Sequence, residues 1–311
     1  MRAVAMSRFG GPEVLEVADL PVREPGPGQV RIRVAAAAVN PTDALFRAGA
    51  HAQALSAFPP PYVPGMDAAG VVDAVGPDTD WEVGDRVMAI VVPAPPEGGA
   101  QQEQVVVPAD SVARVPDGVT LEEAATLPMN GLTARLALDL LDLPSGGTLA
   151  VTGAAGAVGG YAVALAAHAG LRVIADAKES DEELVRGFGA SVVVPRGPEV
   201  AGAIRAAAPD GVDGLIDAAL LGEAVLPAVR DGGGVAHVRP TPLEPVRDLR
   251  FHRVMVAEYA RNRAALEELA RLAADKVLAL RVAETFPPER AADAHRALEA
   301  GGVRGRLLIV F

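Results

Sequence analysis

Apolar and polar residues alternate along this chain in two different rhythms. From Met1 to about Val119, short β-like runs such as RAVAM, QVRIRVAAAAVN and DRVMAIVV are separated by proline and glycine. Short strands at this spacing predict an antiparallel, barrel-like lobe. From Leu121 the rhythm changes, because strand-like runs such as TLAVT, RVIADA and VDGLIDAA alternate with helix-like runs. That alternation predicts a parallel, doubly wound sheet.

The border between the two rhythms carries a helix start signal. Thr120 is followed three positions later by Glu123, a capping box in which the hydroxyl and the carboxylate each bind a backbone N–H of the first turn. Near the C-terminus, the helical run RNRAALEELARLAADK is followed by LALRVAETF, by a second helical run and by RGRLLIVF. We expect these closing elements to rejoin the first lobe rather than to extend the parallel sheet.

The stretch from Thr148 to Gly170, TLAVTGAAGAVGGYAVALAAHAG, contains no charged residue. Its length would permit a membrane span, because about 20 apolar residues cross a bilayer. However, Gly153, Gly156 and Gly159 fall where a β-rich run gives way to an alanine-rich run. This order predicts a strand, a tight turn and a helix, and a βα unit enclosed in a parallel sheet is equally uncharged.

A glycine turn between a strand and a helix is a candidate nucleotide site. The missing side chains let the backbone approach a pyrophosphate, and the N–H groups of Ala157 and Val158 point from the helix N-terminus toward its charge. The spacing is GxxGxxG rather than GxGxxG, and the alternative is that the glycines only allow close packing of helix and strand.

Asp176, at the end of the second strand-like run of this region, and Lys178, just after it, are candidates for contact with the adenosine end of a dinucleotide. Asp176 lies about twenty residues past the glycines, where an acid ordinarily accepts hydrogen bonds from the ribose diol of NAD. Lys178 lies two positions further on and is able to neutralise a 2′-phosphate. The two residues therefore favour different cofactors, NAD(H) and NADP(H).

Composition excludes several classes of partner and site. The net charge of −12 opposes sustained binding to nucleic acid or to an anionic membrane surface, which favours a small-molecule partner. The chain has no cysteine, which removes disulfides, thiolate zinc sites and cysteine nucleophiles. The start, MRAVAMSRFGG, has no apolar region typical of a secretion signal, and we therefore expect a cytoplasmic protein.

Several motifs occur together in one order. They are VNPTD at 39–43, VPGMDAAGVVDAVG at 63–76, GDRV at 84–87, AATLPMNGLTA at 124–134, VTGAAGAVG at 151–159 and the terminal HRALEAGGVRGRLLIVF. In this order the chain resembles the zinc-independent quinone oxidoreductase branch of the medium-chain dehydrogenase/reductase superfamily. The resemblance implies an α/β protein with a split GroES-like catalytic domain at 1–120 and 279–311 and a Rossmann-type cofactor domain at 121–278. It also implies a cleft between the domains, a preference for NADP(H), with NAD(H) as the alternative, and a homodimer.

The resemblance also identifies where zinc-dependent relatives hold their catalytic metal. Their Cys, His and Cys ligands fall here on Asn40, Met66 and Met129. An amide and two thioethers do not form the usual zinc ligand set. We therefore expect no catalytic metal.

The resemblance places Asn40, Asp43 and Thr133 beside the cleft. Asn40 would donate a hydrogen bond to a developing enolate or quinol oxygen, or else serve as a turn residue before a proline. Asp43 would relay a proton, or else hold a turn or an interlobe hydrogen bond. Thr133 would face the nicotinamide, or else be an ordinary helix residue. Tyr62 is a candidate proton donor and equally a candidate packing aromatic.

Two segments depart from the family pattern. Gln101 and Gln102 lie in GAQQEQ where relatives often read GAYAEY, and VRPTPLEP at 238–245 replaces a glycine-containing loop. These departures affect the expected substrate preference.

The leading function is an NAD(P)H-dependent reductase of quinones or α,β-unsaturated carbonyls. The alternatives are an enoyl reductase of a biosynthetic pathway and a cofactor-binding protein without useful turnover. The β-rich run at 250–257 is a candidate edge for pairing two subunits.

Overall fold

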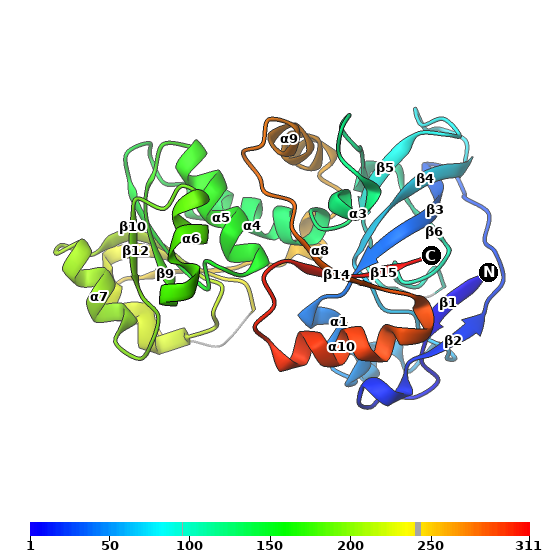
Figure 1. The fold of residues 1–311 in the computed structure, drawn as a ribbon, viewed down its shortest axis with the longest axis horizontal. Coiled ribbons are helices and arrows are strands. Elements are labelled where there is room, and N and C mark those ends of the chain that lie inside the picture. The colour runs from blue at the N-terminus through cyan, green and yellow to red at the C-terminus, as the bar shows by residue number, and fades with distance from the viewer. Residues whose placement is uncertain (95, 240–243) are drawn as a thin grey trace. The chain divides into compact units, whose positions relative to one another are not determined.

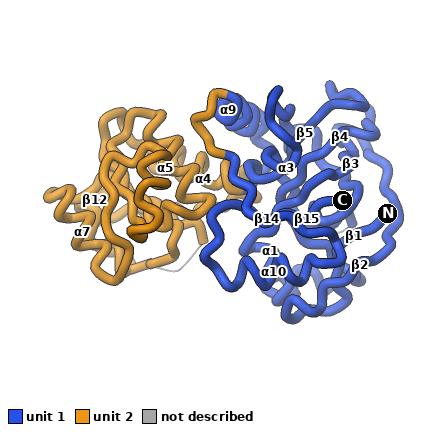
Figure 2. Tube along the Cα trace, in the orientation of Figure 1, with its two compact units in different colours: residues 1–129, 260–274, 280–311 blue, residues 130–259, 275–279 orange. Residues whose placement is uncertain are grey.

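The chain folds into two compact units, which Figure 2 distinguishes by colour. The structure is a computed structural model that describes residues 1–94, 96–239 and 244–311. Unit 1 contains Met1–Met129, Ala260–Ala274 and Leu280–Phe311, and unit 2 contains Asn130–Tyr259 and Asp275–Ala279. The fold class is confirmed, since unit 1 is rich in β-strands and unit 2 is built around a parallel sheet.

Unit 1 is organised around a seven-stranded sheet in the order β14-β15-β3-β4-β5-β7, with β6 also paired to β3. A separate two-stranded sheet pairs β1 with β2. The strands are β1 (Arg2–Ala5), β2 (Glu16–Asp19), β3 (Gln29–Ala38), β4 (Asp67–Val75), β5 (Arg86–Ile90), β6 (Gln104–Pro108), β7 (Val112–Arg114), β14 (Val282–Phe286) and β15 (Arg306–Val310). Because β14 and β15 join β3, the expectation that the closing elements rejoin the first lobe is confirmed.

Alternation of buried side chains explains the core of unit 1. Val30, Ile32 and Val34 of β3 are buried at every second position, as the period of a strand requires. They pack with Val87 of β5 and with Trp81, which is 3% exposed. This cluster places the only tryptophan of the chain in the interior of unit 1.

Short helices and one longer helix complete unit 1. They are η1 (Pro12–Val14), α1 (Pro41–Arg47), α2 (Ala52–Leu55), η2 (Ala109–Ser111), α3 (Leu121–Ala124), α9 (Arg263–Ala274), η5 (Pro288–Arg290) and α10 (Ala291–Ala300). The predicted capping box is confirmed, because the Thr120 hydroxyl accepts the N–H of Glu123 while the Glu123 carboxylate accepts the N–H of Thr120. Helix α9 lies beside β7 in unit 1, where Arg263 pairs with Asp80 and stacks on Trp81.

Unit 2 contains a six-stranded sheet in the order β10-β9-β8-β11-β12-β13, in which every neighbouring pair is parallel. The strands are β8 (Thr148–Thr152), β9 (Arg172–Ala177), β10 (Val192–Pro195), β11 (Val212–Asp217), β12 (Val229–His237) and β13 (Arg250–Arg253). The helices are α4 (Pro128–Leu141, which begins in unit 1), α5 (Ala157–His168), η3 (Glu179–Asp181), α6 (Glu182–Gly187), α7 (Val200–Ala207), η4 (Gly222–Ala228) and α8 (Val256–Tyr259). Figure 1 shows α5 and α6 near the sheet strands β9 and β10.

The strand order of unit 2 locates the place where a ligand binds. Counted along the chain, the order is 3-2-1-4-5-6, the doubly wound arrangement that binds dinucleotides at the carboxyl ends of its strands. The order reverses between β8 and β11. The parallel sheet was thus predicted correctly, and its carboxyl edge is the place to look for functional side chains.

Two further expectations bear on surfaces. Strand β13 lies at the edge of the sheet, with β12 as its one partner among the described residues; pairing of two subunits along this edge stays a prediction. The uncharged stretch 148–170 folds as β8, the glycine turn and α5. Among the described residues, none of the helices has the length and apolar character needed to cross a bilayer.

Candidate functional site

The glycine turn connects the carboxyl end of β8 to the start of α5. Gly153 has φ +69°, a backbone conformation that residues other than glycine adopt only at a cost in conformational energy. A Cβ on Gly159 would lie 2.3 Å from the carbonyl oxygen of Gly153, so Gly159 is required for packing within the turn. A Cβ on Gly156 would meet one atom within 4 Å, the Gly153 oxygen at 3.1 Å. Packing therefore explains Gly159, while a Cβ on Gly156 would meet a single backbone oxygen.

The N-terminus of α5 offers donors to an anion. The first N–H groups of a helix, here those of Ala157 and Val158, have no intrahelical acceptor. Gly156 is the N-cap residue, and it has no side chain with which to cap them. Exposed N–H groups and the positive end of the helix dipole suit a pyrophosphate. The turn therefore fits the central phosphates of a dinucleotide.

Asp176 lies in β9 next to this turn, as the sequence predicted. Its Oδ1 accepts hydrogen bonds from the backbone N–H groups of Gly153 at 2.6 Å and Ala154 at 3.2 Å. The side chain is buried, and burial raises its pKa. Its Oδ2 has no hydrogen-bond partner among the described residues, and Arg196 Nε lies 3.9 Å away. One oxygen thus fixes the turn, and the other is buried and lies on the side of Arg196.

Two cations lie near Asp176. Lys178 is exposed and is the N-cap residue of η3. Arg196 follows the carboxyl end of β10, and its guanidinium is 42% exposed. Arg196 was not predicted from the sequence. Its signal is a cation immediately after the third strand of a doubly wound sheet, which marks a candidate cofactor contact in the same way as an acid after the second strand.

The neighbouring strands bring two more side chains to the same edge of the sheet. Asp217, at the end of β11, accepts the hydroxyl of Thr152 at 2.7 Å and the N–H groups of Leu221 and Gly222. His237, at the end of β12, is buried, and burial lowers its pKa, which keeps the imidazole neutral near pH 7. Both residues were missed, because the predicted strand-like runs continued beyond them, whereas in the structure each is the last residue of its strand.

Asn40 belongs to a buried polar network in unit 1. Its Nδ2 donates to Asp67 Oδ2 at 2.8 Å and to the carbonyl oxygen of Ala38 at 3.4 Å. Its Oδ1 accepts from Arg306 at 2.7 Å, and the residue is 0% exposed. The amide is therefore hydrogen-bonded within the protein at both ends.

Asp43 and Asp67 supply the negative charge of this network. Asp43 accepts the N–H groups of Asn40 at 2.8 Å and of Gly65 at 3.1 Å, and burial raises its pKa to about 7. Asp67 accepts the N–H of Met129 at 2.6 Å and pairs with Arg306 at 3.3 Å. The contacts of Asp43 are those of a helix cap, the structural alternative for this residue. Asp67 and Arg306 were not predicted from the sequence. Each is a charged residue at the end of a buried strand, and this position is the signal that could have identified them.

Tyr62 and Thr133 lie in different units. The Tyr62 hydroxyl donates to the carbonyl oxygen of Phe58 at 2.9 Å, and its ring stacks on Phe9 with centroids 5.5 Å apart. Thr133 is a buried residue of α4 in unit 2. Tyr62 therefore has the contacts of a packing aromatic as well as a place beside a cavity in unit 1.

The three positions matched to zinc ligands contain no conventional ligand set. Besides the hydrogen-bonded Asn40, the sulfur of Met66 accepts the hydroxyl of Thr42 at 3.5 Å, and the guanidinium of Arg306 brings positive charge to the network. Across residues 1–94, 96–239 and 244–311, no group of three or more His, Cys, Asp or Glu side chains is arranged to hold a metal. These residues do not fit zinc.

The two departures from the family pattern have different outcomes. Gln101 and Gln102 are buried, and Gln102 Nε2 donates to the carbonyl oxygens of Glu97 and Gly99. Gln102 therefore holds the backbone of its own loop, whereas Gln101 Nε2 donates to Asp43 Oδ2 at 3.5 Å. In the proline-containing run at 238–245, residues 240–243 lie outside the described residues.

Comparison with protein families and solved structures agrees with this architecture. The alcohol dehydrogenase GroES-like domain family matches residues 26–117, and the zinc-binding dehydrogenase family matches residues 188–309. A solved structure described as an NAD-dependent alcohol dehydrogenase superposes with a TM-score of 0.87 at 32% identity over 100% of both chains. A mycobacterial protein complexed with NADPH superposes with a TM-score of 0.86 at 29% identity over 100% of both chains.

Curated relatives extend the comparison to named reductases. The quinone oxidoreductase of Pseudomonas aeruginosa is 34% identical over 195 residues, which is 61% of this chain and 57% of that protein, so the match spans little more than half of that relative. The 2-haloacrylate reductase of a Burkholderia species is 30% identical over 336 aligned positions, covering 99% of this chain and 98% of that protein. With its two-unit fold and these full-length and partial matches, the chain belongs to the quinone oxidoreductase branch of the medium-chain dehydrogenase/reductase superfamily.

Proposed function

We propose that this protein is an NADPH-dependent reductase that transfers hydride to a quinone or an α,β-unsaturated carbonyl compound without a metal ion. The observation that carries the proposal is the N-terminus of α5, which begins after Gly156 without a side-chain cap and follows the turn that the buried Asp176 holds. These groups suit the pyrophosphate and a ribose of a dinucleotide. When bound, reduced nicotinamide supplies the hydride.

Two cations support NADPH rather than NADH. Lys178 is exposed, and Arg196 directs its guanidinium to within 3.9 Å of Asp176. One oxygen of Asp176 already accepts two backbone N–H groups, so this oxygen is occupied without a hydrogen bond from the ribose diol of NADH. A 2′-phosphate placed beside Asp176 requires neighbouring positive charge, which these two side chains supply. The mycobacterial relative whose structure contains NADPH is consistent with this choice.

Nucleotide affinities test this assignment directly. Lys178→Ala and Arg196→Ala should each weaken NADPH by roughly 10-fold, which corresponds to the loss of a charge-assisted hydrogen bond, and should change NADH by less than about 2-fold. Arg172→Ala is the matched control, because Arg172 is an exposed residue at the opposite end of β9. Equal effects of a variant on NADPH and NADH would remove that residue from the phosphate site.

The acceptor follows from chemistry and from the relatives. Hydride needs an electrophilic carbon, and a hydrogen bond to the conjugated oxygen makes the β-carbon of an enone or quinone electrophilic. The relatives include a quinone oxidoreductase and a 2-haloacrylate reductase. We therefore propose a screen of NADPH oxidation against quinones, enones and enoyl thioesters. Turnover of enoyl thioesters alone would favour the biosynthetic alternative, and tight NADPH binding without any turnover would favour a cofactor-binding protein.

Asn40 is the proposed donor to the acceptor oxygen, and its contacts in unit 1 define what this role requires. Because both N–H bonds of the Asn40 amide are directed at Asp67 and Ala38, an acceptor oxygen would have to replace one of these partners. Asn40→Ala should then lower turnover by about 10²- to 10³-fold with NADPH affinity nearly unchanged. Fluorescence of Trp81 in unit 1 monitors folding of the variant. Normal turnover of Asn40→Ala would leave Asn40 with the structural role of holding Asp67 and Arg306.

We propose that Asp43 and Tyr62 support the site in different ways. Asp43 fixes the N-terminus of α1 and the turn at Gly65 through its two backbone contacts. Tyr62 holds the segment that follows α2, because its hydroxyl donates to Phe58. Proton delivery to the reduced product is then assigned to water, since no step of the proposal requires either residue to ionise.

A further inference from the structure

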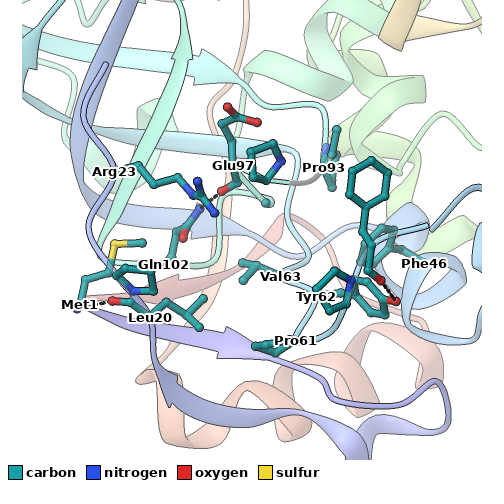
Figure 3. A pocket seen from close by; sticks show the side chains of 16 residues that line it. Met1, Leu20, Arg23, Phe46, Pro61, Tyr62, Val63, Pro93, Glu97 and Gln102 are labelled. Carbon is teal, nitrogen blue, oxygen red and sulfur yellow. Dashed lines mark hydrogen bonds between the residues drawn. The ribbon is translucent and has the colours of Figure 1, made fainter. Parts of the chain in front are cut away.

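A cavity of about 250 Å³ lies within unit 1, and none of its lining residues belongs to the glycine turn of unit 2. Figure 3 shows the side chains that surround it. They come from four separate stretches of chain: the residues flanking β1 and β2, helix α1, the segment after α2 and the segment after β5. Half of the lining residues are proline or aromatic, among them Phe46, Phe58, Pro61, Tyr62 and Pro93, and aliphatic side chains such as that of Val63 add to the wall. The cavity is therefore apolar.

Hydrogen bonds fix the wall on every side. Tyr62 and Met6 exchange two backbone hydrogen bonds of 2.9 and 3.0 Å, and Met1 and Leu20 are joined in the same way. On the opposite side, Gln102 Nε2 donates to two carbonyl oxygens of its own loop, and Gly99 donates to Val63. Proline rings add stiffness because φ is fixed. A preformed cavity of this kind loses little conformational entropy when a ligand enters.

The charged side chains that line the cavity are those of Arg23 and Glu97. Arg23 is exposed, and its guanidinium has no ion-pair partner in the described part of the chain. Its backbone is held, because the carbonyl oxygen of Arg23 accepts from Arg31 at 3.1 Å, while the neighbouring Glu24 pairs with Arg31. In Figure 3 the Arg23 side chain extends toward Gln102 and Glu97. An unpaired guanidinium over an apolar cavity is a site for a carboxylate.

The exposure of Phe58 adds a second sign of a binding site. Phe58 is 41% exposed although it lines the cavity. A large aromatic ring left partly in water gains free energy when a ligand covers it. The cavity volume is about eight times the share of one water molecule in the liquid, roughly 30 Å³, which is enough for one aromatic ring with a short chain.

We propose that this cavity binds a small carboxylate-bearing molecule with a flat apolar ring, held by the prolines and aromatic rings inside and by Arg23 at the rim. Every residue that lines the cavity belongs to unit 1 and none is part of the glycine turn; Tyr62 is the one lining residue that the proposed function also uses.

The first experiment compares 3-phenylpropanoate with its neutral amide, 3-phenylpropanamide, by protein-observed NMR titration of the full chain. A ligand of this size should bind with Kd of about 1 mM, and the carboxylate should bind about 5-fold more tightly than the amide. Arg23→Gln should abolish that difference. Arg33→Gln is the matched control, because Arg33 is exposed in β3, outside the cavity. Glu97→Gln should leave carboxylate binding unchanged or strengthen it, because it removes a negative charge from the rim.

The second experiment tests the apolar wall. Phe58→Ala should weaken both ligands about 5-fold or more, since it removes an aromatic contact. Val92→Ala, at a residue that is 44% exposed and does not line the cavity, should leave both affinities unchanged. Absence of binding up to about 10 mM, equal affinities of acid and amide, or unchanged binding to Arg23→Gln would each overturn the proposal. Chemical-shift changes confined to unit 2 would overturn it as well.

Discussion

The buried carboxyl group of Asp43 makes the stability of unit 1 depend on pH. Burial raises its pKa from an ordinary 3.8 to about 7, and the charge of Asp67 adds to the increase. Between these two values the folded protein keeps a proton that the unfolded chain has lost. Its contribution to stability is therefore complete at low pH and disappears as the pH rises through about 7. From pH 5 to pH 8 this amounts to a loss of about 3 kcal/mol.

Replacing Asp43 by Asn removes this proton exchange. At pH 5 the protonated carboxyl group of Asp43 and the amide of the variant each have one carbonyl oxygen and one donor group beside the two backbone N–H groups, so the variant should be destabilised there by at most about 1 kcal/mol. The difference should shift by about 3 kcal/mol in favour of the variant at pH 8, because the wild type then has a buried charge and the variant does not. Near pH 8 the variant should therefore equal or exceed the wild type in stability.

Urea unfolding followed by Trp81 fluorescence measures this difference. Trp81 is the only tryptophan, and it is 3% exposed in unit 1, so the signal reports that unit. His295 acts in the opposite direction, because burial lowers its pKa to about 3 and its contribution is lost as the pH falls below about 6.5. Because the wild type and Asp43→Asn both contain His295, the difference between their unfolding free energies does not include this effect. Asp117→Asn, at an exposed position, is the control for a change of surface charge. A penalty for Asp43→Asn that is equal at pH 5 and pH 8 would refute the reasoning.

Three further outcomes follow from the same structure. Gly156→Val should abolish measurable NADPH binding in a folded protein. Gly159→Ala should instead destabilise unit 2 by about 2 kcal/mol, because its Cβ would lie 2.3 Å from a backbone oxygen. Circular dichroism measures the folding of each variant and nucleotide titration measures its affinity for NADPH, and tight NADPH binding by Gly156→Val would contradict the assignment. Elemental analysis should find no stoichiometric zinc, and cofactor binding should survive a chelator; one firmly held zinc per chain would count against the proposal. Light scattering at micromolar concentration should give the mass of a dimer paired along β13 (Arg250–Arg253), and a monomer mass would exclude that pairing.

The sequence alone determined the architecture and the cofactor turn. The change of apolar rhythm after Leu121 marks the start of α3, and the alternating runs that follow are the strands and helices of the parallel sheet. The capping box at Thr120 and the turn at Gly153–Gly159 form as predicted. These features depend on residues close together in the sequence, because periodicity, capping and turn conformation are set by local backbone geometry.

Only the tertiary structure decided which partners the polar side chains find. Arg306 reaches Asn40 across 266 positions, and Asp67 reaches Met129 across 62. These contacts depend on β15 pairing with β3 and on β3 pairing with β4. No periodic pattern in one segment specifies which strand of a sheet will lie next to it, so the full hydrogen bonding of Asn40 was not predictable. Arg196 was missed for the same reason, because its proximity to Asp176 is created when β10 pairs with β9.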